Sequence, residues 1–435
     1  MARGKRSVSR RSAIKAGVTA GAAMFAGAPA IAQNAQGGRR FRAFVRHGTT
    51  AGVEELRLRP IEPRQVLVRS EATAPCYTIV AATLATTPAQ QAQVPNHCGF
   101  GIVEEVGSMV RRVQKGDRVV VAGTSQCGQC FQCLHGNPDY CQFTFGGEVW
   151  SPYAEMSDGT PVFASGGIGG LAELMVTLED FCCPVFTDLP ATELTLLGDQ
   201  LTSGFSAGHS AMRFDMGSNV VVFGAGPVGV GVIQAGRVLG ASQVVAIDPV
   251  RYRREFALKM GATTVIDPTV DPDTLVDRIR ELCKAPTDRK LSGGHSYSKQ
   301  GFASNARGAD FAVECAGVQV FPPRVEPSPD PTGVMPVKQA WECTRMGGHV
   351  MLMGLVRGEV SFPGVALALL GRTIHPGQQG GLHMLRDLPR MVKLMEKGRI
   401  DAKSMITKTY SIGETRQAIQ DCADRTIMVG VVTYS

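Results

Sequence analysis

The chain has 435 residues, of which 44% are hydrophobic and 19% are charged, a composition typical of a globular protein. This length exceeds one ordinary hydrophobic core, so we expect at least two domains. The net charge of +7 arises mainly in residues 1–32, which hold six Lys/Arg and no acid, while the rest carries 39 basic against 38 acidic residues. That near balance argues against a nucleic-acid-binding surface.

Residues 1–32 have the three-part order of an export signal. Arg10-Arg11 lies in a basic stretch, a weakly apolar run covers residues 16–28, and Ala30-Ile31-Ala32 forms a small-x-small cleavage site. The apolar run is too short and too rich in glycine to span a bilayer stably. The pattern is similar to a twin-arginine (Tat) signal, although Ala13 stands where Phe is preferred. We therefore expect the Tat translocase to export the folded protein to the periplasm; a disordered basic tail is the alternative.

Residues 33–195 contain short strand-like segments separated by turn residues, at 65–69, 101–106 and 117–121. This spacing predicts a compact antiparallel β-barrel domain. From about residue 196 to residue 374 strands and helices alternate instead. Strands are expected at 220–223, 244–247, 264–266, 311–314 and 349–353, with helices at 229–239 and 251–260. That alternation predicts a doubly wound parallel sheet, the Rossmann architecture.

Two segments interrupt this alternation. Residues 286–307 are polar and rich in Gly and Ser, and residues 321–337 carry six prolines. Neither composition can bury much apolar surface, so we expect both segments to be surface insertions.

A glycine-rich turn at residues 224–229 directly follows the expected strand 220–223 and precedes a helix. In this context Gly224 permits the tight turn, Gly226 lets the backbone approach a pyrophosphate, and Gly229 lets helix and strand pack closely. Val228 lies in the same turn, at the helix N-terminus that offers free N–H groups to phosphate. The pattern predicts a dinucleotide site.

The second strand of this unit ends at Asp248, 19 residues after Gly229. A carboxylate there can accept hydrogen bonds from the adenosine ribose hydroxyls and would repel a 2′-phosphate, so NAD is favoured over NADP. Arg251, Arg253 and Arg254 follow closely and weaken that preference.

Four cysteines with C-x2-C-x2-C-x7-C spacing lie in one short loop, namely Cys127, Cys130, Cys133 and Cys141. Four thiolates can close a tetrahedral zinc site that has no open position, which is a structural site. An iron–sulfur cluster and disulfides are the alternatives, but the ferredoxin pattern has a shorter last gap and a following proline. The cysteines outside the metal sites are expected to behave as small buried hydrophobic residues.

Together these motifs resemble the zinc-dependent medium-chain alcohol dehydrogenases, which pair a GroES-like catalytic domain with a Rossmann domain. The resemblance covers roughly residues 41–435 and includes the stretches at 158–160, 371–373 and 387–390. It implies that residues 375–435 return to the catalytic domain, that the protein is a homo-oligomer, and that its substrate is a small alcohol or aldehyde.

The resemblance further implies a catalytic zinc held by Cys76, His97 and Asp199, with a fourth position open for water or substrate. Thr78 would pass the proton of the alcohol outward as hydride moves to the nicotinamide. Leu355 and Val356 would contact the nicotinamide ring, and Arg386 is a weaker candidate for the pyrophosphate. The expected cofactors are therefore two zinc ions, one catalytic and one structural, and NAD.

Three positions depart from the family pattern. The family usually has Asp where this chain has Ile79, Glu where it has Cys98, and in some members a proton-relay His where it has Ala81. Because the first two usually support the metal ligands, their loss can cost roughly 10- to 100-fold in metal affinity or activity.

Three hypotheses follow from these observations. The first is an exported, NAD-dependent zinc alcohol dehydrogenase. The second keeps NAD as a tightly held group that a redox partner reoxidises, because the periplasm has no obvious NAD recycling system. The third is a relative that binds zinc and nucleotide without catalysis.

Overall fold

A computed structural model describes residues 38–85, 87–144, 151–286 and 307–434. Residues 39–435 form one compact unit, separate from residues 1–38. The expected export signal, and all but the two end residues of the expected insertion at 286–307, lie outside the described residues. In the part of the chain that is described, no helix combines the length and apolarity needed to cross a membrane.

The first half of the unit contains a small closed barrel of five strands in the order β1-β2-β7-β8-β4. Their bounds are Arg40–Gly48 (β1), Thr50–Leu58 (β2), Ala154–Glu155 (β7), Pro161–Ala164 (β8) and Ala89–Val94 (β4). All pairs are antiparallel except β4 and β8. The expected antiparallel barrel is thus confirmed, with one parallel closure.

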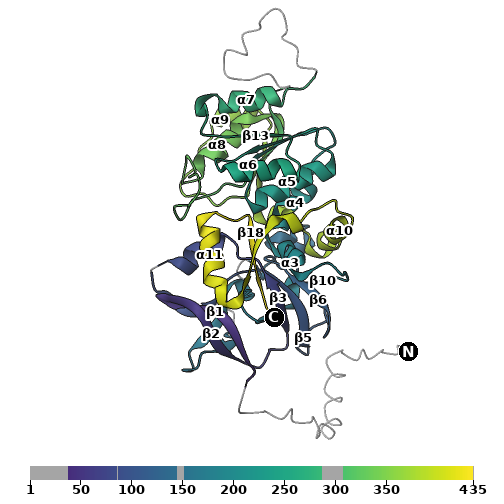
Figure 1. The fold of residues 1–435 in the computed structure, drawn as a ribbon. Coiled ribbons are helices and arrows are strands. Elements are labelled where there is room, and N and C mark those ends of the chain that lie inside the picture. The colour runs from purple at the N-terminus through teal and green to yellow at the C-terminus, as the bar shows by residue number, and fades with distance from the viewer. Residues whose placement is uncertain (1–37, 86, 145–150, 287–306, 435) are drawn as a thin grey trace, which may run out of the picture. The chain divides into compact units, whose positions relative to one another are not determined.

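A second sheet beside the barrel takes strands from both ends of the unit, in the order β10-β6-β5-β3-β18-β17, with β9 also paired to β3. The strands are Cys182–Pro184 (β10), Arg118–Val121 (β6), Gly99–Val106 (β5), Gln65–Thr73 (β3), Leu174–Leu178 (β9), Val429–Thr433 (β18) and Ile406–Ser411 (β17). Figure 1 shows the yellow β18 and helix α11 (Thr415–Asp424) beside the purple and blue strands from early in the chain.

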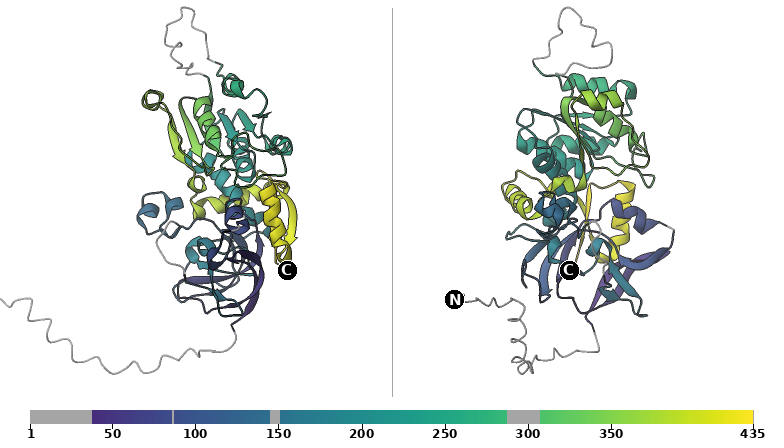
Figure 2. Two further views of the ribbon diagram at one scale, coloured as in Figure 1. Left: turned by 90° about the vertical axis from the view of Figure 1, so that its left-hand side faces the viewer. Right: turned by 180° about the vertical axis from the view of Figure 1, so that it is seen from behind.

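The second half is a parallel six-stranded sheet in the order β13-β12-β11-β14-β15-β16, the strand order of a Rossmann fold. The strands are Thr264–Ile266 (β13), Gln243–Ile247 (β12), Asn219–Phe223 (β11), Ala309–Glu314 (β14), Thr344–Leu352 (β15) and Thr373–Pro376 (β16). The order reverses between β11 and β14, the place where such sheets bind ligands. The views in Figure 2 show this sheet with its helices apart from the barrel.

Both faces of the parallel sheet are buried. Val220 and Val222 of β11 pack into one apolar cluster and Val221 and Phe223 into another, because successive side chains of a strand point to opposite faces. The helices that cover and connect the strands are α3 (Ala191–Leu194), α4 (Gln200–Ser206), α5 (Pro227–Leu239), α6 (Arg251–Met260), α7 (Leu275–Leu282), α8 (Val334–Cys343), α9 (Gly364–Leu369) and α10 (Met384–Glu396); α1 (Thr78–Leu84) and α2 (Phe131–Leu134) belong to the first half.

The segment 321–337 needs one correction. It was expected to be a surface insertion throughout, but its last four residues form the first turn of α8, and Val337 is completely buried. Phe321, at its other end, packs against the apolar core of the barrel. The segment therefore connects two cores.

Candidate functional site

The four cysteines of the lobe come together as their spacing predicts. The Sγ atoms of Cys127 and Cys133 lie 3.9 Å apart, as do those of Cys130 and Cys141. A tetrahedron of sulfurs at zinc–sulfur bond length has S···S distances of about 3.8 Å, so the lobe fits this metal. All twelve cysteines of the chain are described, and all are free.

Local geometry favours the thiolate form of one cysteine of this lobe, Cys130, whereas burial raises the pKa of Cys127 and Cys133. The N–H of Cys130 donates to Cys127 Sγ at 3.3 Å, and that of Cys127 donates to Cys141 Sγ at 3.4 Å. Burial opposes ionisation of Cys130, but hydrogen bonds from backbone N–H groups and neighbouring thiols outweigh it and lower its pKa to about 6. A thiolate is the metal-binding form of cysteine.

A second metal-compatible group is formed by Cys76, His97 and Asp199. Their ligand atoms all lie within 4.8 Å of one another. Cys76 follows the end of β3, His97 lies between β4 and β5, and Asp199 immediately precedes α4. One sulfur, one imidazole nitrogen and one carboxylate oxygen match the mixed donor set of a catalytic zinc site.

Within this trio the Nε2 atom of His97 lies 3.3 Å from Asp199 Oδ2. Burial acts to lower the pKa of His97, but its hydrogen bonds to Asp199 and Cys76 raise it well above the usual range. Burial acts to raise the pKa of Asp199, yet the same pairing with His97 lowers it. A bound metal would replace this shared proton, so metal binding and proton release are linked here.

Asn96 holds two of the three ligand segments together. It is completely buried and adopts φ = 75°, a left-handed conformation that Asn tolerates better than most residues. Its Oδ1 accepts the backbone N–H of Cys76 at 3.2 Å, and its Nδ2 donates to Thr73 Oγ1 at 2.9 Å. No pattern in the sequence indicated this role of Asn96, although Asn is among the residues that adopt a positive φ most readily.

Gln379 supports the third ligand. Its Nε2 donates to Asp199 Oδ1 at 3.3 Å, and its Oε1 accepts from Ser203 Oγ at 2.9 Å. The residue has φ = 44° within the turn Gln378–Gly381, so a strained backbone aims this side chain at the site. Nothing in the local sequence pattern indicated this contact.

The glycine turn has the geometry that its pattern predicts. Gly224 has φ = 91°, and a Cβ added to Gly229 would lie 1.8 Å from the carbonyl oxygen of Gly224. Position 229 therefore accepts only glycine. The turn leads from β11 into α5, whose first turn contains Val228.

A cavity of about 370 Å³ extends from this turn to Cys76, and its lining includes Gly224, Gly226, Val228 and Asp248. Both oxygens of Asp248 accept backbone N–H groups, from Ala225 and Val250, each at 2.8 Å. These bonds fix the carboxylate at the end of β12 and leave it further accepting capacity.

Of the three arginines after Asp248, Arg253 lines this cavity. Arg251 pairs with Glu255, and Arg254 pairs with Asp267. These two cations are neutralised locally, so Arg253 is the one placed to meet a phosphate group.

Leu355, Val356 and Arg386 are not among the residues that line this cavity. Leu355 is 67% exposed, and the guanidinium of Arg386 is bound to Asp387 and Ser210. The predicted cofactor contacts of these three residues stay predictions. Thr78 is exposed and donates from Oγ1 to Cys76 Sγ at 3.1 Å.

Comparison with known proteins gives consistent results along the chain. The model of the alcohol dehydrogenase GroES-like domain matches residues 62–187, and the model of zinc-binding dehydrogenases matches residues 227–326. Geraniol dehydrogenase from Castellaniella defragrans is 30% identical over 385 residues, which cover 86% of this chain and 91% of that protein. The chain belongs to the zinc-dependent medium-chain alcohol dehydrogenase family.

Two further relatives of this family align over nearly the whole described unit. An NDMA-dependent alcohol dehydrogenase from Amycolatopsis methanolica is 26% identical, with 91% of this chain and 99% of that protein covered. The crystal structure of benzyl alcohol dehydrogenase from Acinetobacter calcoaceticus superposes with a TM-score of 0.74 at 26% identity, covering 91% of this chain and 100% of that chain.

Membership of this alcohol dehydrogenase family makes the departures near the metal ligands informative. Ile79 packs in the apolar core of the barrel, and Cys98 is completely buried with its Sγ 3.5 Å from the carbonyl oxygen of Ala74. Burial raises the pKa of the Cys98 thiol well above its usual value, so it supplies no charge to the site. Neutral amides contact two of these residues instead, since Gln379 donates to the Asp199 carboxylate and Asn96 accepts the backbone N–H of Cys76.

Proposed function

We propose that the protein is an NAD-dependent alcohol dehydrogenase with one zinc at Cys76, His97 and Asp199 and a second at the four-cysteine lobe. The observation that carries this proposal is that one cavity is lined both by Cys76, a member of the ligand trio, and by Gly226 of the glycine turn. Substrate and nucleotide can therefore meet beside the metal site.

In this proposal the bound zinc would acidify an alcohol, and NAD would accept hydride. The chain's own residues have separate tasks. Cys76, His97 and Asp199 would hold the metal, Thr78 would give the substrate proton a short path to solvent, and Gly226 would leave room for the pyrophosphate. Asp248 would accept from the ribose hydroxyls.

The experiment is a steady-state assay of alcohol-dependent NAD reduction on purified protein, with zinc content measured by mass spectrometry. We expect about two zinc ions per chain and a loss of turnover of roughly a thousandfold or more in Asp199→Ala, which also loses one zinc. Asp158→Ala is the matched control, because this carboxylate is exposed and caps a turn at Thr160. Full turnover in Asp199→Ala would disprove the proposal.

A second candidate function is favoured by the proline-rich segment, defined here as residues 318–333. Ser328, Pro329 and Asp330 of this segment line the proposed nucleotide cavity, so the segment would contact a nucleotide bound there. We propose as the alternative that NAD is held permanently and reoxidised in place by a redox partner. The Amycolatopsis relative is likewise named for NDMA and not for NAD.

Contacts on both sides of the cavity support this alternative. The backbone N–H of Val320 donates to Tyr77 Oη at 3.1 Å, and Arg324 pairs with Asp424 at 3.0 Å, both partners belonging to the catalytic half. In the Rossmann half, Glu326 accepts the backbone N–H of Arg251 at 3.2 Å. A nucleotide could leave only after such contacts break, so its release would be slow.

The two candidates differ in one measurement. Folded protein is desalted and denatured, and the released nucleotide is quantified by chromatography. Stoichiometric NAD or NADH supports the captive form, and Arg324→Ala should then release it faster while Arg278→Ala, on the exposed side of α7, should not. Protein that is free of nucleotide but reduces added NAD supports the exchangeable form.

We further propose export to the periplasm through the Tat translocase and assembly into a homo-oligomer. The support is the Arg10-Arg11 pattern for export and family membership for assembly. Replacing both arginines by lysine should keep the protein in the cytoplasmic fraction. An unchanged distribution would contradict the export proposal.

A further inference from the structure

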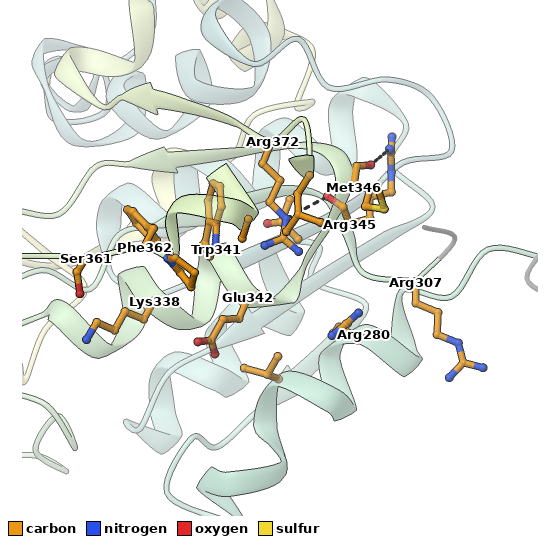
Figure 3. A pocket seen from close by; sticks show the side chains of 15 residues that line it. Arg280, Arg307, Lys338, Trp341, Glu342, Arg345, Met346, Ser361, Phe362 and Arg372 are labelled. Carbon is orange, nitrogen blue, oxygen red and sulfur yellow. Dashed lines mark hydrogen bonds between the residues drawn. The ribbon is translucent and has the colours of Figure 1, made fainter. Parts of the chain in front are cut away.

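A second cavity, of about 650 Å³, lies in the Rossmann half between α7, α8 and α9 (Figure 3). Its described lining shares no residue with the nucleotide cavity. Helix α8 lies between the two cavities, because some of its residues line one cavity and some line the other. Met335, Pro336 and Gln339 face the nucleotide cavity, whereas Lys338, Trp341 and Glu342 face the second cavity.

The described lining of this second cavity is strongly cationic. It contains five basic side chains and one carboxylate, namely Arg280, Arg307, Lys338, Arg345, Arg372 and Glu342. Two of the cations are neutralised by carboxylates outside the cavity, since Arg345 pairs with Asp310 at 2.5 Å and Arg307 with Glu281 at 2.9 Å. Within the described ranges, Arg280, Lys338 and Arg372 form no ion pair, so the cavity holds an excess of positive charge.

Arg372 is the most constrained of these cations. Its guanidinium lies over the ring of Trp341, with Cζ 4.9 Å from the ring centroid, and its Nε makes a long hydrogen bond of 3.4 Å to the carbonyl oxygen of Arg345. Partial burial lowers its pKa to about 10, and the nearby charge of Arg280 acts in the same direction, whereas Cys343 and the Glu342 carboxylate act in the opposite one. Glu342 can offset only one of the three cations Arg280, Lys338 and Arg372, so a half-buried Arg372 beside Arg280 is stabilised further when an anion joins them.

Figure 3 shows Arg280 and Arg372 reaching into the cavity from opposite walls, one from α7 and the other from the residues before β16. Beside them lies an apolar wall. The rings of Trp341 and Phe362 pack with centroids 4.8 Å apart, and Ala366 of α9 continues this surface. The cavity thus combines paired guanidinium groups with an apolar surface, and its volume suits a small organic ligand.

We propose that this cavity binds a small phosphate monoester, with its phosphate between Arg280 and Arg372 and its organic group against Phe362. Planar guanidinium groups match phosphate oxygens in pairs, and a dianion balances the two cations. The site is independent of zinc and of the nucleotide cavity.

The test is isothermal titration of the full-length protein with phenyl phosphate at fixed ionic strength and saturating NAD, which occupies the nucleotide cavity. We expect saturable binding near one site per chain, with Kd raised roughly tenfold or more in both Arg280→Gln and Arg372→Gln. The Kd of Arg372→Lys should lie between that of the glutamine variants and that of the unchanged protein. Lysine keeps the positive charge but cannot donate two parallel hydrogen bonds as a guanidinium does. Lys259→Gln, an equal charge change on α6, should leave Kd unchanged.

A titration with inorganic phosphate separates the free ion from its ester. Weaker binding of inorganic phosphate supports the role of the apolar wall, whereas equal or tighter binding overturns the assignment to an ester. Absence of binding at millimolar phenyl phosphate, or an unchanged Kd in both glutamine variants, would overturn the site itself. Thermal unfolding of each variant without ligand checks that its fold is intact.

Discussion

The four-cysteine lobe and the Cys76–His97–Asp199 site are built in opposite ways. The lobe takes all its ligands from one loop, and backbone N–H groups of that loop bind the sulfurs. The second site would take its ligands from three distant segments, and the side-chain amides of Asn96 and Gln379 contact two of them. We call the four-cysteine lobe the closed site, because four sulfurs would leave no free coordination position, and the Cys76–His97–Asp199 group the open site. The closed site is organised by local chain geometry, whereas the open site depends on the tertiary fold.

We expect the largest effect on stability from a substitution in the four-cysteine lobe. Cys141→Ser removes one of four sulfurs from a completely buried position, so the lobe should lose its metal and the protein more than about 4 kcal/mol of unfolding free energy. Urea unfolding and zinc content measure this. Cys182→Ser is the matched control, because Cys182 is equally buried in the same apolar cluster but is not a ligand. A metal-loaded lobe in Cys141→Ser would contradict the closed-site assignment.

The next effect weakens the open site alone. Gln379→Leu removes the amide that binds Asp199, so the zinc affinity of this site should fall roughly 10- to 100-fold while the lobe keeps its metal. Competition with a chromogenic chelator measures the affinity. Gln378→Leu is the neighbouring control, because this side chain has no hydrogen bond to Asp199 in the described structure. Equal affinities in both variants would exclude a supporting role for Gln379.

A chelator should remove zinc from the two proposed sites at different rates. In the proposed two-zinc protein, the zinc at Cys76, His97 and Asp199 would have a coordination position free for a chelator, whereas four sulfurs would enclose the zinc of the lobe. The first of these zinc ions should therefore leave about tenfold faster or more. The decay of zinc content under dipicolinate, followed beside activity, measures this. Activity should be lost with the first zinc. Simultaneous loss of both metals would show that the sites are not distinct in the way proposed.

The smallest effect concerns the turn that presents His97. Asn96→Gly and Asn96→Ala both remove the side-chain hydrogen bonds, but only Ala adds strain at φ = 75°. Asn96→Ala should therefore be less stable than Asn96→Gly by about 1 kcal/mol, as measured by urea unfolding. Equal stabilities would mean that the turn relaxes, and that the hydrogen bonds alone position this ligand segment.

The same contrast explains what the sequence could predict. The lobe and the glycine turn could be predicted from the sequence because the residues of each lie close together in the chain, and their spacing determines their geometry. The ends of α6 and β13 also matched, since Gly261 and the following strand pattern are local signals. The trio was reached only through family resemblance, because no pattern within the chain links His97 to Asp199.

The supporting side chains could not be predicted for a physical reason. Asp199 and Gln379 are 180 positions apart, and their contact depends on how α4 packs against the turn Gln378–Gly381. The contacts of residues 318–333 with both halves could not be predicted either, because composition indicated exposure but not which cavity the segment lines. The positive φ of Asn96 could have been predicted, since Asn is among the residues that adopt a positive φ most readily.

Strand β18 has a consequence for the order in which the protein is made. Val432 and Thr433 pair with Thr73 and Ala72, the last residues of β3 and close neighbours of Cys76. On the ribosome, this part of β3 can pair with β5 through Ala72 and Phe100, but its other edge stays unpaired until residues 429–433 have been synthesised. A nascent chain therefore exposes an unfinished strand edge beside its first metal ligand, and we expect the open zinc site to form only after synthesis has passed β18.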